Sequence, residues 1–265
     1  LGLGLIEKII VVEEIAKRSA AVALALGQNL GLGAKLLLIA GNEGQKRKYV
    51  PKIISGDIKV SFAMTEPAGG SDILGVISTT AVPDGDDFII NGQKIFITGA
   101  HVADYIHTIV LTDKGAPKRK RTQALSIFMV DTKLPGVTIR KINKLSIKGC
   151  SACEVFYEDV KVPKESLLGS LNQGWFYLLP VINPERVWVA GMCLGIMEAI
   201  LETAVQYASV RIAFDKPIGQ FMAIQHMIAD MTVDVELTRN LIYKCAWMCD
   251  QKMDFQKEAL MAKLV

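Results

Sequence analysis

One stretch of sequence decides the fold: Ala63-Met64-Thr65-Glu66-Pro67-Ala68-Gly69-Gly70-Ser71-Asp72-Ile73-Leu74-Gly75. It follows a segment in which Ile58, Val60 and Phe62 alternate with polar neighbours, the pattern of a half-buried β-strand. Proline, two glycines and serine then predict a tight loop where that strand ends. Hydroxyls and successive backbone N–H groups in such a loop suit a phosphorylated or carbonyl-rich ligand. A Gly-Gly-Ser-Asp string alone would equally be typical of an ordinary turn.

The hydrophobic period changes twice along the chain, which predicts an α+β protein. Residues 5–56 have apolar side chains at helical spacing, residues 57–163 form short alternating runs, and helical spacing returns from about residue 171. The predicted organisation is an N-terminal helical part, a central β domain and a C-terminal helical bundle: residues 1–56, 57–165 and 166–265.

Local signals place the individual elements. Asn42 is a suitable N-cap for a helix over about 42–54. Gly and Asn tolerate positive φ, so hairpin turns are expected at Pro83–Asp87 and at Asn91-Gly92. The C-terminal helices are expected over about 171–182, 184–210, 218–250 and from 255 onward.

Composition excludes several functional classes. The 265 residues carry a net charge of only +3, so no global field favours nucleic acid. The basic run Lys118–Arg121 is expected to be a solvated hairpin loop between strands at 106–111 and 124–130. A span of a bilayer needs about 20 apolar residues. Because polar residues and glycines interrupt the apolar segment 19–40, no membrane span is expected.

The five cysteines do not form a recognisable framework. An odd number without framework spacing indicates reduced thiols. Cys150 and Cys153 form a C-x-x-C, but zinc normally needs more ligands, and a redox motif should open a helix. This pair precedes a strand pattern at Glu154–Val160. We therefore expect structural cysteines and no metal site.

Four blocks resemble the signatures of the acyl-CoA dehydrogenase flavoprotein family. Residues 63–75 fill every defining position of its first signature, 91–98 resemble its second flavin-contacting strand, 154–163 its strand ending in Val-x-Val-Pro, and 211–214 its Arg-x-x-Phe motif. The resemblance implies that family's fold, with N-terminal helices, a β-barrel-like central domain and a C-terminal antiparallel helix bundle. It also implies that this chain is incomplete at both ends, because relatives extend further in both directions.

The resemblance implies FAD as cofactor. The positions that correspond to FAD contacts are Phe62, Met64, Thr65, Gly70, Ser71, Phe96, Ile97, Thr98, Arg211 and Phe214. Ser71 would also contact the bound CoA, while Arg211 and Phe214 would contact the FAD of a neighbouring subunit. A guanidinium can bind phosphate through two hydrogen bonds, which favours arginine over lysine there. Taken singly, the apolar positions are equally typical of core packing.

The catalytic base is assigned to Glu185. Most relatives carry this base near the C-terminal end, but isovaleryl-type and long-chain-type enzymes carry it where this chain has Pro184-Glu185-Arg186, and crotonobetainyl-CoA reductase-like members have Glu-Arg there. Arg186 would then contact CoA, and Asn183 the substrate. A desolvated carboxylate can be tuned to act as a base. The alternative is that Glu185 is a first-turn acid favoured by a helix dipole.

The implied function is α,β-dehydrogenation of an acyl-CoA, with a glutamate removing the α-proton and flavin accepting the β-hydride. Electrons would pass to an electron-transfer flavoprotein, and the enzyme would be a homotetramer in the cytoplasm, or in the mitochondrial matrix of a eukaryote. Alternatives are an enoyl-CoA reductase running in reverse and a non-catalytic partner subunit. The family's usual Trp, Gly and Gln are replaced here by Phe96, Asp215 and Met222, and the last two changes affect the FAD contacts between subunits.

Overall fold

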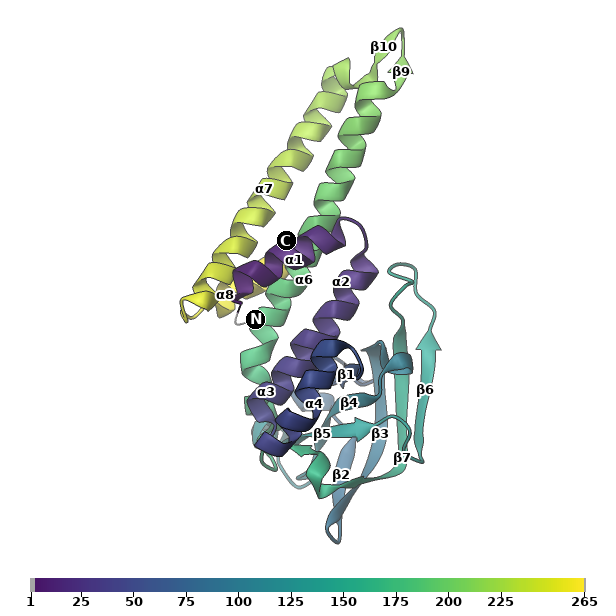
Figure 1. The fold of residues 1–265 in the computed structure, drawn as a ribbon, viewed down its shortest axis with the longest axis vertical. Helices are drawn as coiled ribbons and strands as arrows, with labels where there is room; N and C mark the ends of the chain where they lie inside the picture. The colour runs from purple at the N-terminus through teal and green to yellow at the C-terminus, as the bar shows by residue number, and fades with distance from the viewer. Residues whose placement is uncertain (1–2, 265) are drawn as a thin grey trace. The chain divides into compact units, whose positions relative to one another are not determined.

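The computed structural model describes residues 3–264 and divides into two compact units. One unit is Leu1–Leu24 with Asn183–Val265, and the other is Ala25–Ile182. The first is mainly helical and the second contains a β-sheet with its own helices (Figure 1). The predicted α+β class is confirmed, and the predicted division into three domains stays a prediction.

The sheet of the second unit has eight strands. Their bounds are β1 (Val60–Ala63), β2 (Thr80–Asp84), β3 (Asp87–Thr98), β4 (Tyr105–Leu111), β5 (Leu125–Asp131), β6 (Val137–Ile142), β7 (Ala152–Pro163) and β8 (Leu167–Leu168). Hydrogen bonding follows the order β6-β7-β3-β2-β4-β5-β8, and β1 pairs with β4 in parallel. The strand predicted before the 63–75 loop is therefore part of this sheet, paired with β4.

Both faces of the sheet are buried, because β4 and β5 send alternate side chains to two cores. Ile109 and Leu111 of β4 join a core with the helices of this unit, while Ile106 and Val110 join a second core lined by β3, β5 and β7. The pattern explains why the sequence over 105–111 is almost continuously apolar.

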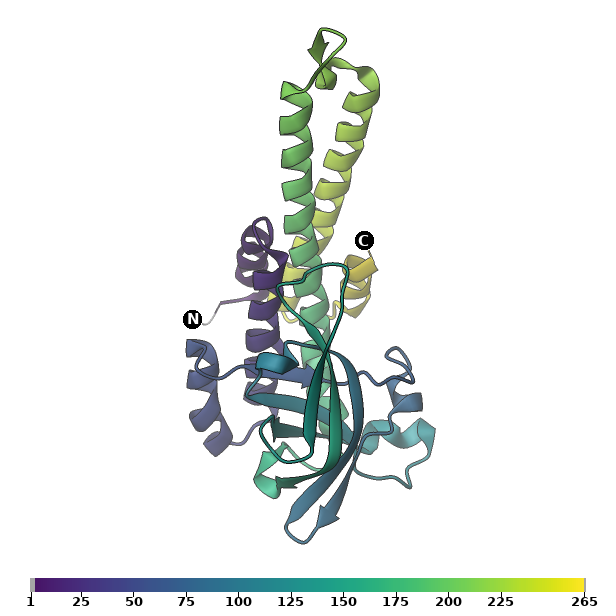
Figure 2. The same cartoon turned by 90° about the vertical axis from the view of Figure 1, so that its right-hand side faces the viewer.

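The sheet also curls on itself, as Figure 2 shows. Phe88 of β3 and Phe128 of β5 lie three places apart in the strand order, yet their ring centroids are 5.0 Å apart. Thr108 of β4 and Tyr157 of β7 share a buried hydrogen bond of 2.8 Å. These contacts across the curl agree with the predicted barrel-like domain.

This unit also contains helical segments, of which those over residues 28–55 pack against the first core. The helical segments are α2 (Ala20–Gly27), a π-helical segment η1 (Gln28–Lys35), α3 (Leu36–Ala40), α4 (Glu43–Ser55), the short α5 (Ile73–Val76), and 3-10 turns η2 (Ala100–Val102), η3 (Lys118–Gln123) and η4 (Lys164–Ser166). Asn42 caps α4 as predicted, within a full capping box with Gln45, and Gly56 ends the helix in the left-handed conformation.

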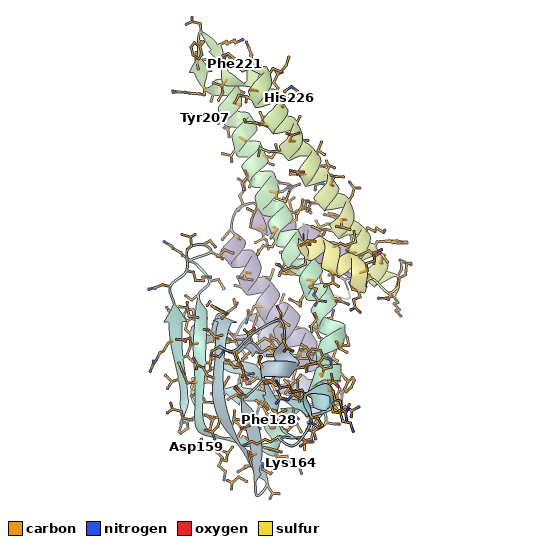
Figure 3. All side chains as sticks on the ribbon, turned by 180° about the vertical axis from the view of Figure 1, so that it is seen from behind. Phe128, Asp159, Lys164, Tyr207, Phe221 and His226 are labelled. Atoms are coloured by element: carbon orange, nitrogen blue, oxygen red, sulfur yellow. The ribbon has the colours of Figure 1, made fainter. Side chains whose placement is uncertain are left out.

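The helical unit is built on a long hairpin. Its elements are α1 (Leu5–Ala16), α6 (Gly174–Val210, of which residues from 183 belong here), β9 (Ile212–Ala213), β10 (Lys216–Pro217), the turn η5 (Ile218–Gln220), α7 (Met222–Asp250) and α8 (Gln256–Leu264). Figure 3 labels Tyr207, Phe221 and His226 near the end at which α6 and α7 are joined. A Cβ at Gly195 would lie 2.2 Å from the Glu13 carbonyl oxygen, so this glycine allows α1 to approach α6 closely.

A polar network fixes α1 in this unit. The Arg239 guanidinium donates to Glu13 over 2.6 Å and also contacts Glu198. Glu13 further accepts the Tyr243 hydroxyl over 2.6 Å, and Lys17 lies 2.6 Å from Glu198. Charged groups from α1, α6 and α7 thus neutralise one another at the contact between these helices.

One predicted helix break and one predicted hairpin turn are wrong. The helices predicted over 171–182 and 184–210 are one continuous helix, α6, although Pro180 and Pro184 each remove a backbone donor. Asn91-Gly92 forms no hairpin turn: the register of β3 against β7 shifts between Ile90 and Gly92, which is a β-bulge within one strand. A Cβ at Gly92 would lie 2.5 Å from the Thr79 hydroxyl, so close approach explains this glycine. The turn at Pro83–Asp87 is confirmed.

Two helical stretches, Ala20–Ala40 and Gly174–Val210, are by length and composition alone apolar enough to cross a membrane. Gln28 and Asn29 interrupt the first stretch but leave its average hydropathy high. Core helices of soluble proteins have the same length and composition, and 33% and 39% of the two apolar windows are buried within the protein. Both polar side chains donate to protein carbonyls, Gln28 to Thr98 over 2.8 Å and Asn29 to Ile53 over 3.0 Å.

Cys150 and Cys153 are buried free thiols. Burial raises the pKa of both, which makes them poor nucleophiles. Cys153 is part of the second core and lies on β7, and its Sγ is 3.7 Å from Nδ1 of His101. Both cysteines thus have the environment of structural residues. Within residues 3–264, no three His, Cys, Asp or Glu side chains are arranged to hold a metal ion.

Candidate functional site

The loop after β1 folds back on itself beside β3. The Ile95 N–H donates to the Thr65 carbonyl over 2.9 Å, which fixes the start of the loop against β3. Glu66 and Gly69 then exchange backbone hydrogen bonds of 3.3 and 3.0 Å. A Cβ at Gly70 would lie 3.2 Å from Cγ2 of Thr65, so the glycine keeps the space beside this threonine. The two blocks singled out in the sequence, 63–75 and 91–98, are therefore neighbours.

A buried ion pair fixes this arrangement. Nζ of Lys94 lies 2.9 Å from Oε1 of Glu66, and the two side chains are 0% and 1% exposed. Lys94 also donates to the Met64 carbonyl over 3.1 Å. Glu66 accepts the Ser78 N–H and hydroxyl over 2.7 and 2.6 Å and the Thr79 N–H over 3.0 Å. The Glu66 carboxylate thereby connects Lys94 of β3 to Ser78 and Thr79 at the far end of the loop, while Lys94 itself contacts Met64 at the near end.

The pair is charged at neutral pH. Burial by itself raises the pKa of Glu66, but the Lys94 ammonium and hydrogen bonds from Ser78, Lys94 and Thr79 outweigh burial and hold that pKa at about 2. Burial lowers the pKa of Lys94 to about 8, against the opposing effect of Glu66. At a pH between these two pKa values, the Glu66 carboxylate and the Lys94 ammonium are both charged. Each buried charge is then stabilised by the opposite charge of its partner.

Phe96 is the unusual residue of β3. It is 62% exposed, and its φ of 61° lies in the left-handed region, where a bulky side chain is an outlier. The register of β3 against β7 shifts between Lys94 and Ile97, so Phe96 lies in a β-bulge. A strained, exposed aromatic residue held by a rigid framework is typical of a ligand site.

The end of β3 is held by side chains from two other elements. The Thr98 carbonyl accepts the Gln28 amide and the Ser61 hydroxyl, each over 2.8 Å. Ile97 is 2% exposed and belongs to the second core, so only its backbone can face a ligand. Phe62 and Met64 are half-buried against the first core, and Gly70 and Ser71 are exposed.

The other candidate residues lie in the helical unit. Glu185 is half-buried on α6, and Arg186 donates to Oδ1 of Asn183 over 2.6 Å one turn away. Because α6 begins at Gly174, Glu185 is not a first-turn residue, and the helix dipole does not account for it.

The Arg-x-x-Phe motif lies at the far end of the helical hairpin. Ala213 of β9 pairs with Lys216 of β10, leaving Phe214 and Asp215 as a two-residue turn with φ of 51° and 63°. Positive φ at both positions defines a type I′ turn, which favours Asn and Gly. Phe214 is 90% exposed, its ring centroid is 6.2 Å from that of Phe221, and Arg211 is exposed at the end of α6.

Comparison with known proteins identifies the family. Residues 1–57 match the acyl-CoA dehydrogenase N-terminal domain, 61–160 the middle domain and 172–265 the C-terminal domain. The chain is 38% identical over 251 residues to mitochondrial isovaleryl-CoA dehydrogenase of Pongo abelii, covering 94% of this chain and 59% of that protein. It is 40% identical over 256 residues to the caffeyl-CoA reductase-Etf complex subunit CarC of Acetobacterium woodii, covering 96% and 66%. The chain belongs to the acyl-CoA dehydrogenase family.

Solved structures of acyl-CoA dehydrogenase relatives have the same fold. Butyryl-CoA dehydrogenase from Megasphaera elsdenii gives a TM-score of 0.92 at 34% identity, covering 98% of this chain and 67% of that one. The FAD complex of PigA gives 0.92 at 28% identity, covering 100% and 68%. The chain thus spans about 59% to 68% of the length of these four relatives.

The acyl-CoA dehydrogenase signatures predicted that the loop and β3 belong to the candidate site. They did not predict the contacts that hold the loop and β3 in place. Glu66 lies inside the first signature, yet its ion pair with Lys94 was not predicted. The available signal was a lysine at an apolar register of a strand, between Gln93 and Ile95. Gln28 and Ser61 gave no signal, because only the fold brings them to the Thr98 carbonyl. The ligand roles assigned from the resemblance stay predictions.

Asp215→Gly should stabilise the helical unit, because glycine takes positive φ without the steric cost that other residues carry. The type I′ turn is strained here where the acyl-CoA dehydrogenase family usually has glycine. We expect a gain of about 0.5 kcal/mol and a melting temperature higher by about 1–2 °C. Thermal unfolding of the variant checks this, with Asp215→Ala as the matched control that should lower the melting temperature. A glycine variant less stable than wild type would contradict the turn assignment.

Proposed function

We propose that the protein catalyses FAD-dependent α,β-dehydrogenation of an acyl-CoA thioester. The observation that carries this proposal is Phe96, an exposed ring in a strained bulge beside the loop that begins at Thr65. The buried Glu66–Lys94 pair holds this framework rigid. A flat apolar face beside a threonine hydroxyl fits an isoalloxazine ring.

Each side chain then has a defined task. Thr65, Phe96 and Thr98 would hold the ring, and the exposed Ser71 would bind a pyrophosphate. When bound there, FAD supplies the two-electron acceptor for the hydrogen at the substrate's β-carbon. Glu185 would remove the α-proton, and Arg186, positioned by Asn183, would bind the CoA portion.

The reverse direction is a second candidate. The relative from Acetobacterium woodii is named as a reductase subunit in an Etf complex. The same base and cofactor can reduce an enoyl-CoA, since each step is reversible. That name also supports an electron-transfer flavoprotein as the redox partner of this protein.

A homotetramer is the proposed assembly. Apolar side chains are exposed along the hairpin of α6 and α7, at Ile200, Val210, Met222, Met227 and Leu237. Exposed apolar surface of this extent is typical of protein interfaces. Arg211 and Phe214 at the end of the hairpin would then reach the cofactor of a neighbouring subunit.

Visible spectroscopy tests the proposed function. The purified protein should bind FAD and show a flavin spectrum. Anaerobic addition of a panel of acyl-CoAs should bleach this spectrum with one substrate class. If only the chemically reduced protein reacts, and an enoyl-CoA restores its colour, the enzyme is a reductase. A protein that does not take up added FAD would contradict both candidates.

A further inference from the structure

The chain passes between the two compact units at two places, and both places lie inside helices. The first crossing falls between Leu24 and Ala25 in α2, and the second falls between Ile182 and Asn183 in α6. Motion of one compact unit relative to another is the ordinary expectation within a chain. A regular helix across each crossing would oppose such motion. The regularity of the two helices at these points therefore decides whether the units can move.

Two prolines flank the crossing in α6. Pro180 precedes it and Pro184 follows it, one helical turn apart. Proline has no N–H to donate to the carbonyl four residues earlier, so neither the Phe176 nor the Pro180 carbonyl can accept the usual helical hydrogen bond. Two successive turns of α6 each lack a backbone hydrogen bond where the chain leaves the sheet unit. Prolines are also the commonest places at which helices bend.

The two halves of α6 are held by different cores. Before the crossing, Leu178 and Val181 belong to the first core of the sheet unit. After the crossing, α6 packs against α1 in the helical unit: a Cβ at Gly191 would lie only 3.2 Å from Cδ1 of Ile9. The segment with the two prolines thus joins two parts of α6 that are each fixed elsewhere.

The first crossing has the same arrangement. Lys17 is held in the helical unit by Glu198, over 2.6 Å. Gln28 is held in the sheet unit, where its amide donates to the Thr98 carbonyl over 2.8 Å. Between these two attachments runs α2, and from Gln28 the winding becomes π-helical as far as Lys35. π-Helical turns are rare and frequently mark functional sites in helices. Each crossing thus coincides with an irregularity of its helix.

We propose that residues 180–184 of α6 and the junction of α2 with η1 form a two-part hinge between the helical unit and the sheet unit. A few residues at the ends or irregular points of helices are enough to absorb a hinge motion. Glu185 and Arg186 follow the hinge and move with the helical unit, whereas the 63–75 loop and Phe96 stay with the sheet unit. The hinge then controls when the proposed base meets the proposed flavin site. This consequence rests on the proposed function, but the hinge itself does not.

The first test measures the distance between the units. Cys193 is an exposed thiol on the helical half of α6, and Asp86→Cys adds a second one at the exposed β2–β3 turn. The half-buried Cys249 is removed by Cys249→Ser. Spin labels on the two exposed thiols are measured by double electron–electron resonance with excess FAD present. Assembly with excess unlabelled protein confines the signal to pairs within one chain.

The protein with its native prolines should give a broad distance distribution. In Pro180→Ala/Pro184→Ala the distribution should narrow, because both backbone hydrogen bonds across the crossing are restored. Pro51→Ala is the matched control, since Pro51 lies inside α4 of the sheet unit and away from both crossings. It should leave the distribution as broad as before. A narrow distribution with the native prolines, equal widths in the double variant, or the same narrowing in the control would each overturn the hinge.

A kinetic measurement then connects the hinge with the chemistry. Anaerobic flavin reduction by the acyl-CoA that bleaches the wild type should slow in the double variant by up to about 10²-fold, the cost of misplacing a catalytic group by about 1 Å. Pro180→Ala alone, which leaves the neighbour of Glu185 unchanged, should slow reduction in the same direction. Pro51→Ala should react at the wild-type rate.

The two measurements separate the hinge from the proposed function. A narrowed distribution with a wild-type rate of reduction would overturn the control of the base by the hinge. If no acyl-CoA reduces the wild-type flavin, the proposed function fails, and the distance distributions still decide whether the hinge exists.

Discussion

Glu185→Gln should retain FAD and lose substrate-dependent flavin reduction by about 10²–10⁴-fold, the contribution of a general base. The amide has the size of the carboxylate but cannot accept the α-proton. The structure removes the competing explanation for this residue. Glu185 lies well inside α6, which begins at Gly174, so stabilisation by the helix dipole does not apply.

The measurement is anaerobic stopped-flow reduction of the flavin by the bleaching acyl-CoA. Glu202→Gln is the matched control, because Glu202 is an exposed carboxylate on the same helix. It should reduce its flavin at the wild-type rate. A normal dissociation constant for substrate together with a slow reduction step would assign Glu185 to chemistry. Reduction of the Glu185→Gln flavin at a near-normal rate would mean that another group is the base.

Much of the fold could be predicted because hydrophobic period and turn chemistry act locally. The strand before the loop, the hairpin at Pro83–Asp87 and the helix capped by Asn42 all follow from neighbours in sequence. The predictions failed where contacts between residues far apart in the sequence determine the local structure. Tertiary packing carries α6 through two prolines, and contact with Thr79 makes Asn91-Gly92 a bulge in place of a turn.

The sequence predicted which positions belong to the candidate site. It did not predict the contacts that hold those positions in place. Signatures indicated the loop at 63–75 and the strand at 91–98, and the fold places them side by side. The left-handed Phe96 could not be inferred, since nothing in its neighbours requires positive φ and only the bulge against β7 imposes it. The same holds for the buried partners of Glu66, which come from segments 12 to 28 residues away.

Glu66→Gln should destabilise the sheet unit by about 3–5 kcal/mol, because it leaves the Lys94 ammonium buried without its counter-charge. Lys94 is fully buried, and its remaining partner is the Met64 carbonyl. Loss of the Glu66–Lys94 ion pair should displace both the loop at 63–75 and the bulge at Phe96. FAD affinity should therefore fall as well. Urea unfolding and flavin release measure the two effects. Adding Lys94→Met should restore part of the lost stability, since a neutral amide at position 66 and an apolar side chain leave no unpaired charge buried.

The same variant tests the electrostatic origin of the effect through pH. The folded pKa of Glu66 is held at about 2, below its ordinary value of 4.5. A depressed carboxyl pKa contributes stability that is present above pH 4.5 and is lost as pH falls towards 2. Wild type should therefore lose stability across this window, and Glu66→Gln should lack this part of the slope. A variant with the wild-type slope would show that the carboxylate is not the titrating group. In that case the loop would be held by its hydrogen bonds from Ser78 and Thr79 without a contribution from charge.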